Sequence, residues 1–402
     1  MGETLRLALE VVAWGGIGAV VYSYALFPVV LFLVAALHQA GRDAAFVLRK
    51  RDRRKALDRV DLDWPHVAVV ISAYNEERHL QQRIDNLMAL DYPADRLHAY
   101  IGSDGSRDGT AAILTGQGDE PRLKAFAFEV NRGKASVLND LVSRGDEPIL
   151  VFSDANTFFR PDALKRLVAG FADPGVGGVS GELRLIGAGG DNQDSLYWRV
   201  EQFLKFFEAR IGALLGANGA IYAIRRSLWK PLRPDTICDD FCVAMNVAAA
   251  RSRLLYEPRA WAEEETPERI GEEVKRRIRI GIGNFQALVR HPEYLLRTSW
   301  ATRFAYLSHK VLRWIAPHLL IVAMAASAAL AVESTGWRWG LLAQALSYLG
   351  AAAALGLTQR GVKLPKVITL AAFLYALNWA FLVASWRYAT GRYAGSWARS
   401  SR

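Results

Sequence analysis

Hydrophobic residues gather at the two ends of the chain, whereas the middle alternates short apolar runs with polar turns. Near the N-terminus, residues 11–37 contain no Asp, Glu, Lys or Arg and exceed the ~20 residues that a helix needs to cross a bilayer. The alternative, a cleaved signal peptide, has an apolar core of only ~7–15 residues. The pattern therefore favours a membrane-spanning helix.

Three further apolar runs of spanning length follow near the C-terminus, at residues 314–332, 339–357 and 367–386. A basic run at 49–55 comes after the first hydrophobic segment, and basic flanks tend to remain in the cytoplasm. We therefore expect a multi-pass protein of the inner, cytoplasmic membrane whose middle part is cytoplasmic. If each later run crosses the membrane once, the basic tail at 387–402 ends outside the cytoplasm. Either one of the runs is therefore re-entrant and does not cross, or the tail departs from the tendency of basic flanks to stay in the cytoplasm.

The middle of the chain repeats a strand pattern followed by a helix pattern. Residues 67–71 form a continuous apolar, β-rich run, typical of a strand buried on both faces, and apolar residues at helical spacing follow it. Comparable strand or helix patterns occur at 100–101, 123–130, 134–142, 149–152 and from 161 onward. This alternation predicts an α/β fold with a doubly wound, mostly parallel sheet.

Polar residues follow three of these strands, at 73–76, 104–106 and 154–156. Ligands of open α/β sheets bind at the carboxyl ends of the strands, where such loops meet. Helix capping could explain any one of the loops, because Asp, Asn and Ser are favoured capping residues. Three polar loops at corresponding positions indicate a binding site.

Five segments occur in the order that a known family shows: VVISAYNEE (69–77), SDGSRDGT (103–110), NRGKASVLN (131–139), FSDANTFFRPDAL (152–164) and CDDF (238–241). Together with the apolar ends, they resemble the membrane-integrated bacterial family 2 glycosyltransferases, such as poly-N-acetylglucosamine, hyaluronan and cellulose synthases. The resemblance implies a GT-A-like domain flanked by transmembrane and interfacial helices. The predicted division is an N-terminal transmembrane helix (1–40), a basic juxtamembrane linker (41–64), a cytosolic glycosyltransferase domain (65–292), an amphipathic interfacial segment (293–313), transmembrane helices (314–386) and a basic C-terminal tail (387–402).

The resemblance implies a nucleotide-diphosphate sugar as donor, taken to be a UDP-sugar, and Mg²⁺ or Mn²⁺ to neutralise its diphosphate. Asp154 and Asn156 match the family's Asp-x-Asp element with an amide in the second position, and hard cations prefer such oxygen ligands. The expected nucleotide-binding residues are Ala73, Asn75, Glu76, Asp104, Lys134 and Asp154. For Lys134, a solvated lysine at a helix start is the alternative.

Two adjacent carboxylates, Asp239 and Asp240, fall where the family has Thr-Glu-Asp, whose last residue is the general base. One carboxylate suffices to take the proton from an attacking hydroxyl. Asp240 is therefore the expected base, and Asp239 the second catalytic candidate. Compensation of a helix dipole would also explain acidic residues at a helix start.

The expected diphosphate and acceptor residues are Arg276, Arg277, Arg279, Asn218 and Gly219. The three arginines lie where processive members resemble Gln-x-x-Arg-Trp, and arginine suits phosphate oxygens, although a basic helix on lipid headgroups is the alternative. Ile280 replaces the family's Trp, which removes a flat surface for a sugar ring. This departure argues against a polymer-extruding enzyme.

The net charge of +10 comes largely from clusters that flank the apolar runs. A surface facing anionic lipid explains this charge more simply than nucleic-acid binding. The expected partners are the nucleotide sugar, a glycan or lipid-linked acceptor, the bilayer and polysaccharide export proteins, with no nucleic acid. Cys238 and Cys242 lack further metal ligands nearby and are expected to be buried free thiols.

The leading prediction is an inverting hexosyl- or N-acetylhexosaminyltransferase of exopolysaccharide biosynthesis. It would pass a sugar to a growing polysaccharide or lipid-linked acceptor at the cytoplasmic membrane face. Transfer of a single sugar to a polyprenyl phosphate or lipid is one alternative. An inactive membrane scaffold or binding subunit is another, although the expected base and metal carboxylate are both present.

Overall fold

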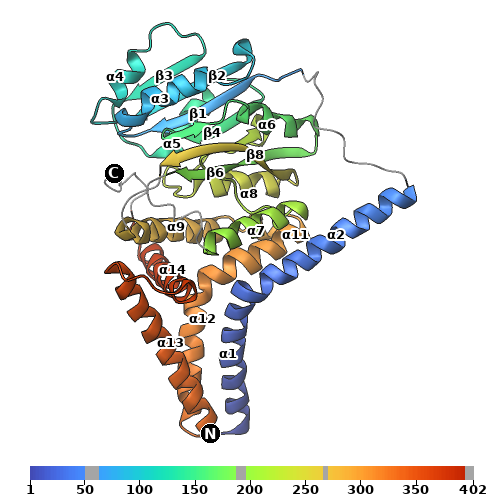
Figure 1. Ribbon diagram of the computed structural model, residues 1–402, viewed down its shortest axis with the longest axis vertical. Coiled ribbons are helices and arrows are strands. Elements are labelled where there is room, and N and C mark those ends of the chain that lie inside the picture. Colours follow the sequence, from blue (N-terminus) through green and yellow to red (C-terminus); the bar gives the residue numbers. More distant parts are fainter. Residues whose placement is uncertain (50–62, 187–195, 266–269, 394–402) are drawn as a thin grey trace.

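The computed structural model describes residues 1–49, 63–186, 196–265 and 270–393. An α/β domain lies above a bundle of long helices, with further helices lying across the junction between them (Figure 1). Residues 50–55 of the predicted basic run at 49–55, and the last tail residues, 394–402, lie outside the described residues.

The α/β domain contains an eight-stranded mixed sheet in the order β3-β2-β1-β4-β7-β6-β8-β5. Strands β3, β2, β1 and β4 pair in parallel, whereas β7 is antiparallel to both of its neighbours and β5 is antiparallel to β8. The strands are β1 (Val67–Ala73), β2 (Leu97–Asp104), β3 (Leu123–Phe128), β4 (Ile149–Asp154), β5 (Thr157–Phe159), β6 (Val176–Ile186), β7 (Tyr222–Arg225) and β8 (Arg253–Glu265). The predicted GT-A-like, mostly parallel fold is confirmed.

Every residue of the central strand β1 is buried, because helices cover both faces of the sheet. One face packs on α3 (Glu77–Met88), α4 (Thr110–Thr115) and α6 (Ala163–Ala169). The other face packs on α5 (Lys134–Ser143) and α8 (Asp239–Ala249). Short 3₁₀ turns lie at Ala94–Arg96 (η2), Gly170–Ala172 (η3) and Arg226–Leu228 (η4).

Four helices are long and apolar enough to cross a membrane in the described part of the chain. The first runs from Glu3 to Leu48 and consists of α1 (Glu3–Val21), a π-helical turn η1 (Tyr22–Leu26) and α2 (Phe27–Arg49). The others contain α12 (Leu312–Ala331), α13 (Thr335–Gln359) and α14 (Lys366–Ala389). These helices match the four predicted apolar runs and indicate membrane integration.

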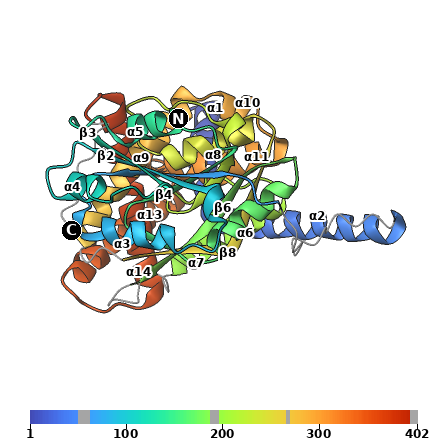
Figure 2. The same cartoon turned by 90° about the horizontal axis from the view of Figure 1, so that it is seen from above.

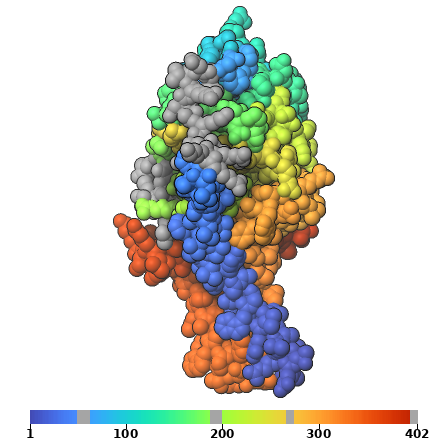
Figure 3. Space-filling model, turned by 90° about the vertical axis from the view of Figure 1, so that its right-hand side faces the viewer, coloured from blue at the N-terminus to red at the C-terminus, as the bar shows by residue number. Residues whose placement is uncertain are grey.

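The end of α2 projects from the body of the protein (Figure 2). The bundle formed by α1, α12, α13 and α14, called the stem below, is narrower than the domain above it (Figure 3). Helices α7 (Leu196–Arg210) and α9 (Ile270–Arg290) lie across the top of the stem (Figure 1). The short helices α10 (Glu293–Leu296) and α11 (Trp300–Ala305) lead into a π-helical turn η5 (Tyr306–Val311) and then α12. Part of the segment expected in the interface is therefore continuous with a membrane helix, because the apolar helix begins at Trp300.

One of the hydrophobic clusters extends from the sheet into the stem. It joins Val70 of β1 and Leu138 of α5 to Phe241 of α8, Tyr306 of η5 and Phe381 of α14. Since close packing transmits displacement, the α/β domain and the membrane helices are not independent bodies joined only by linkers.

Candidate active site

The loops after β1 and β2 hold each other in place. The backbone N–H of Asn75 donates to Ser106 Oγ at 3.1 Å, and Asn75 Oδ1 accepts from the N–H of Arg107 at 2.8 Å. Asn75 has a left-handed φ of 54°, which asparagine tolerates better than most residues. The N–H of Glu76 donates to Thr110 Oγ1 at 2.8 Å, so both predicted residues lie at a defined rim of the sheet.

Asp104, at the end of β2, orders the next loop. Its fully buried carboxylate accepts from the backbone N–H groups of Arg132 at 2.8 Å and Gly133 at 2.9 Å. Gly133 has φ +86°, a conformation that other residues rarely adopt. This arrangement sets the start of α5 and thus the direction of Lys134.

Lys134 bridges two of the predicted acidic residues. Its Nζ donates to Asp154 Oδ1 at 2.9 Å and lies 3.2 Å from Asp239 Oδ2. Burial alone lowers the pKa of Lys134, but the Asp154 and Asp239 carboxylates more than offset this effect and raise it. The start of α5, the end of β4 and the start of α8 therefore meet at one cation.

Asp240 lies beside this cluster in the first turn of α8. Burial and the neighbouring Asp239 carboxylate raise the pKa of Asp240 to about 6, opposed by Lys134 and by the backbone N–H of Phe241. That N–H donates to Asp240 Oδ1 at 2.8 Å, which leaves Oδ2 facing the loop that precedes β7. A carboxylate with a pKa near neutrality is suited to accept a proton from a hydroxyl.

Gly219 lies directly against this carboxylate. A Cβ atom added at Gly219 would lie 3.0 Å from Asp240 Oδ2, tighter than ordinary van der Waals contact. The neighbouring Asn218 is held by its backbone N–H, which donates to Ser180 Oγ at 3.0 Å. The loop expected to receive the acceptor thus adjoins the expected base.

Asp154 and Asn156, the predicted metal ligands, lie at and just after the end of β4. Asn156 Nδ2 donates to Glu264 Oε1 at 3.0 Å, which orients the amide and leaves its oxygen for another partner. Among the described residues, no group of three or more His, Cys, Asp or Glu side chains could hold a metal ion. The protein donors fit Mg²⁺ or Mn²⁺ only as a partial shell, and diphosphate oxygens would complete it.

Two of the predicted arginines of α9 have different neighbours. Arg277 stacks over the ring of Phe373 in α14 at 5.5 Å, on the membrane side. Arg279 acts electrostatically on Cys238, the residue before α8. Ile280 packs against the hydrophobic core, and a Cβ at Gly283 would lie 2.5 Å from Cys238 Sγ. Helix α9 is therefore packed tightly against the start of the helix that carries Asp240.

Three residues near the site escaped the sequence analysis. Arg83 is fully buried, and its Nη2 donates to Ser153 Oγ at 2.9 Å behind Asp154; burial lowers its pKa to about 9 although Asp154 raises it. Glu264 orients Asn156, and Lys205 of α7 interacts electrostatically with Asp240. Their local sequence patterns are those of exposed charged residues, so only the fold reveals these positions. Cys238 and Cys242 are buried free thiols, as predicted.

Comparison with known proteins agrees with this arrangement. Residues 68–230 match the family described as Glycosyl transferase family 2. This part of the chain is therefore similar to glycosyltransferases of family 2. The chain is 28% identical over 236 residues to a poly-beta-1,6-N-acetyl-D-glucosamine synthase of Staphylococcus epidermidis, a match that covers 56% of each chain. The corresponding Staphylococcus aureus enzyme is 26% identical over 239 residues, again covering 56% of each.

The match therefore spans little more than half the length of these glycosyltransferase relatives. Among solved structures, a mannosyltransferase from Pyrobaculum calidifontis, determined with GDP-Man and Mn²⁺, has a TM-score of 0.68. The superposition covers 97% of this chain and 99% of that chain at 23% identity. This likeness extends the shared fold to the membrane helices.

Proposed function

We propose that this protein is an inverting glycosyltransferase that moves a sugar from a nucleotide-diphosphate sugar, a UDP-sugar, to a hydroxyl of a glycan or lipid-linked acceptor. The observation that carries the proposal is Asp240, whose free carboxylate oxygen faces Gly219 beside the Lys134 cluster. The poly-N-acetylglucosamine synthase relatives support an N-acetylhexosamine as the sugar.

Each part of the site has a proposed role that follows from its position. The linked loops at Asn75 and Asp104 form the rim where the nucleoside would bind, and Lys134 and Asp154 lie next to the place of the diphosphate. Asp240 takes the proton from the acceptor hydroxyl as that oxygen attacks the anomeric carbon opposite the departing diphosphate. Gly219 leaves room for the acceptor beside the base.

Asp154 and the oxygen of Asn156 would hold Mg²⁺ or Mn²⁺. When bound, the cation supplies charge neutralisation for the departing diphosphate. The Mn²⁺ and GDP-Man bound to the structurally similar mannosyltransferase support this proposal. Glu264 contributes by fixing the Asn156 amide, and Lys134 supplies positive charge from the other side of Asp154.

The acceptor is either a growing polysaccharide or a single lipid-linked phosphate. The similarity to poly-N-acetylglucosamine synthases favours a polysaccharide. The second candidate is favoured by Ile280, which packs into the core and offers no aromatic surface for a sugar ring. Sizing the product on a gel distinguishes a polymer from a single addition.

The proposed location is the cytoplasmic membrane, with the α/β domain on the cytoplasmic side. The four long apolar helices support membrane integration, and the basic run at 49–55 favours the cytoplasmic side for the domain that follows it. Nucleotide sugars are made in the cytoplasm, so the donor would reach the rim from that side. The test is accessibility of an engineered cysteine on the exposed β3 residue Lys124 (Lys124→Cys) to an impermeant reagent in intact cells and inverted vesicles. Labelling in intact cells would contradict the proposed orientation.

Asp240→Asn provides the test of the reaction. The amide cannot accept the hydroxyl proton, so UDP release in the presence of acceptor and Mn²⁺ should fall by about 10²–10⁴-fold. Binding of UDP, measured by calorimetry on the detergent-purified protein, should stay within about threefold because the rim is unchanged.

Asp119→Asn, on an exposed residue remote from the rim, is the matched control and should retain wild-type turnover. Retained turnover in Asp240→Asn would contradict the role of the base. Absence of turnover in the wild-type protein with every nucleotide sugar, together with absence of UDP binding, would contradict the proposed function itself.

A further inference from the structure

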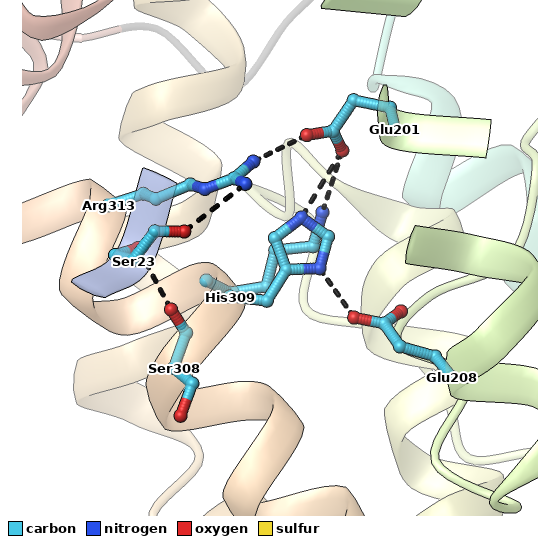
Figure 4. A network of polar contacts seen from close by, with 7 residues as sticks. Ser23, Glu201, Glu208, Ser308, His309 and Arg313 are labelled. Carbon is cyan, nitrogen blue, oxygen red and sulfur yellow. Dashed lines mark hydrogen bonds and ion pairs between the residues drawn. The ribbon is translucent and has the colours of Figure 1, made fainter. Parts of the chain in front are cut away.

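Two π-helical turns face each other where the membrane helices enter the α/β domain. The hydroxyl of Tyr22 in η1 lies 3.0 Å from Ser308 Oγ in η5, and Ser23 Oγ donates to the carbonyl oxygen of Ser308 at 2.9 Å. Arg313 Nη2 donates to the carbonyl oxygen of Ser23 at 3.4 Å. π-Helical turns are uncommon and often occur at functional sites. These two turns are bonded to each other (Figure 4).

A buried charge network joins η5 to α7. His309 is only 3% exposed; its Nδ1 lies 2.5 Å from Glu208 Oε1 and its Nε2 lies 3.3 Å from Glu201 Oε2 (Figure 4). Each of its two ring nitrogens therefore faces a carboxylate oxygen of α7. Glu201 also pairs with Arg313. Burial by itself raises the pKa of Glu201, but His309 and the other nearby cations lower it well below its usual range.

Helix α7 leads directly to the loop that faces the base. The carbonyl oxygen of Glu208 accepts from the N–H of Ala213 at 2.8 Å, which anchors the start of this loop to the last turn of α7. The loop then reaches Gly219, which abuts Asp240. A shift of α7 would therefore move the acceptor side of the site.

The same π-helical turn also contacts the helix that carries the base. The ring of Tyr306 in η5 lies 6.0 Å from that of Phe241, and Trp314 lies 6.0 Å from Phe241 and 5.7 Å from Tyr306. Phe241 directly follows Asp240, and its N–H donates to the Asp240 carboxylate. The turn η5 thus supports both the base and the loop opposite it.

We propose that His309 is a positioning residue: by clamping α7 to the start of the membrane helix α12, it sets the distance between Asp240 and the acceptor loop. This inference rests on the proposed role of Asp240 as the base. His309 touches neither donor nor acceptor and acts through Glu208 and Glu201. A change in the packing of the stem would consequently change the distance between the reacting groups, because the six-residue turn η5 contacts both α7 and Phe241.

The test compares His309→Gln with His318→Gln. Glutamine is neutral and can satisfy only part of the two-carboxylate site. His318 lies in α12, the helix that follows η5, where its Nε2 is 2.9 Å from Ser385 Oγ in α14. For His309→Gln we expect kcat to fall by about 30–100-fold, since misplacement by about 1 Å costs about 10²-fold. KM for the donor and Kd for UDP should stay within about twofold, and His318→Gln should remain within about threefold of wild type in every parameter.

The double variant Glu208→Gln with His309→Gln covers the case in which the single variant does not fold. It removes the uncompensated buried carboxylate, so the protein should fold and bind UDP while kcat stays at least about tenfold low. Wild-type kcat in a folded single or double variant would overturn the inference. Loss of UDP binding in both would also overturn it, because the network would then serve only the fold. Absence of turnover in the wild-type protein instead refutes the proposed function.

Discussion

Replacing Lys134 with methionine removes the cation that Asp154 and Asp239 share. Methionine keeps the length of the apolar stem, so the principal change is electrostatic. Asp240 also loses a nearby positive charge, which is one of the influences that lower its pKa. The variant therefore brings three carboxylates together without their common partner.

The expected loss of stability follows from the geometry. The Lys134 side chain is 17% exposed, and its partners Asp154 and Asp239 are 32% and 11% exposed. Removing one partner of a fully buried ion pair costs about 3–5 kcal/mol, and partial solvent screening reduces this to about 2–3 kcal/mol. For a domain of this size, that loss corresponds to a fall in melting temperature of roughly 4–12 °C.

The assay is thermal unfolding of the detergent-purified protein at neutral pH, followed by the same scan with UDP and Mn²⁺. Lys134 is proposed to lie beside the diphosphate, so its loss should weaken UDP binding, and the ligands should raise the melting temperature less in Lys134→Met than in wild type. At a pH of about 5 the difference between the proteins should narrow. Without Lys134, the pKa of Asp240 lies above its value of about 6, and protonation then relieves the repulsion.

The control is Lys124→Met, which changes an exposed lysine of β3 and should shift the melting temperature by less than about 2 °C. An unchanged melting temperature in Lys134→Met would show that the ion pairs contribute nothing net to stability. A larger deficit at pH 5 than at neutral pH would contradict the assignment of the loss to carboxylate repulsion.

Three further predictions concern Asp240. Gly219→Ala should lower kcat about tenfold with little change in UDP affinity, because the added Cβ would lie 3.0 Å from Asp240 Oδ2. The control is Gly340→Ala in α13, where an added Cβ would have no atom within 4 Å. Equal kcat values in the two variants would contradict the expected crowding of Asp240. The pH profile of kcat/KM should lose activity as pH falls through about 6, since protonated Asp240 cannot act as a base. Because Asp239 raises that pKa, Asp239→Asn should move the acid limb to lower pH, and a shift to higher pH would refute the electrostatic assignment.

Local patterns predicted the elements that periodicity can encode. The buried strands β1 and β4, the helix α5 and the four apolar helices lie close to their predicted positions. The antiparallel strands β5 and β7 were not anticipated, because segments of three and four residues carry too little alternation to be recognised. The extension of the helix that contains α12 back to Trp300 was not anticipated either, because the aromatic and basic residues there resemble an interfacial segment.

The role of Asp104 shows why residue type alone did not settle the site. Sequence reasoning assigned its carboxylate to the nucleoside, and in the fold that carboxylate accepts from Arg132 and Gly133. A side chain with two acceptor oxygens can serve a ligand or a neighbouring loop, and the choice depends on what the fold brings beside it. Binding of a nucleoside by Asp104 therefore stays a prediction.

The sequence by itself determined the membrane runs, the α/β class and the acidic residues at the rim, because hydrophobic periodicity and short motifs are local properties. Only the tertiary structure decided that Lys134 joins Asp154 to Asp239, that Gly219 abuts Asp240 and that His309 clamps α7. These partners are far apart along the chain, and their meeting depends on the packing of the sheet against the helices. Burial, together with the adjacent Asp239 carboxylate, then raises the pKa of Asp240 to about 6, and only the fold decides how deeply this carboxyl group is buried.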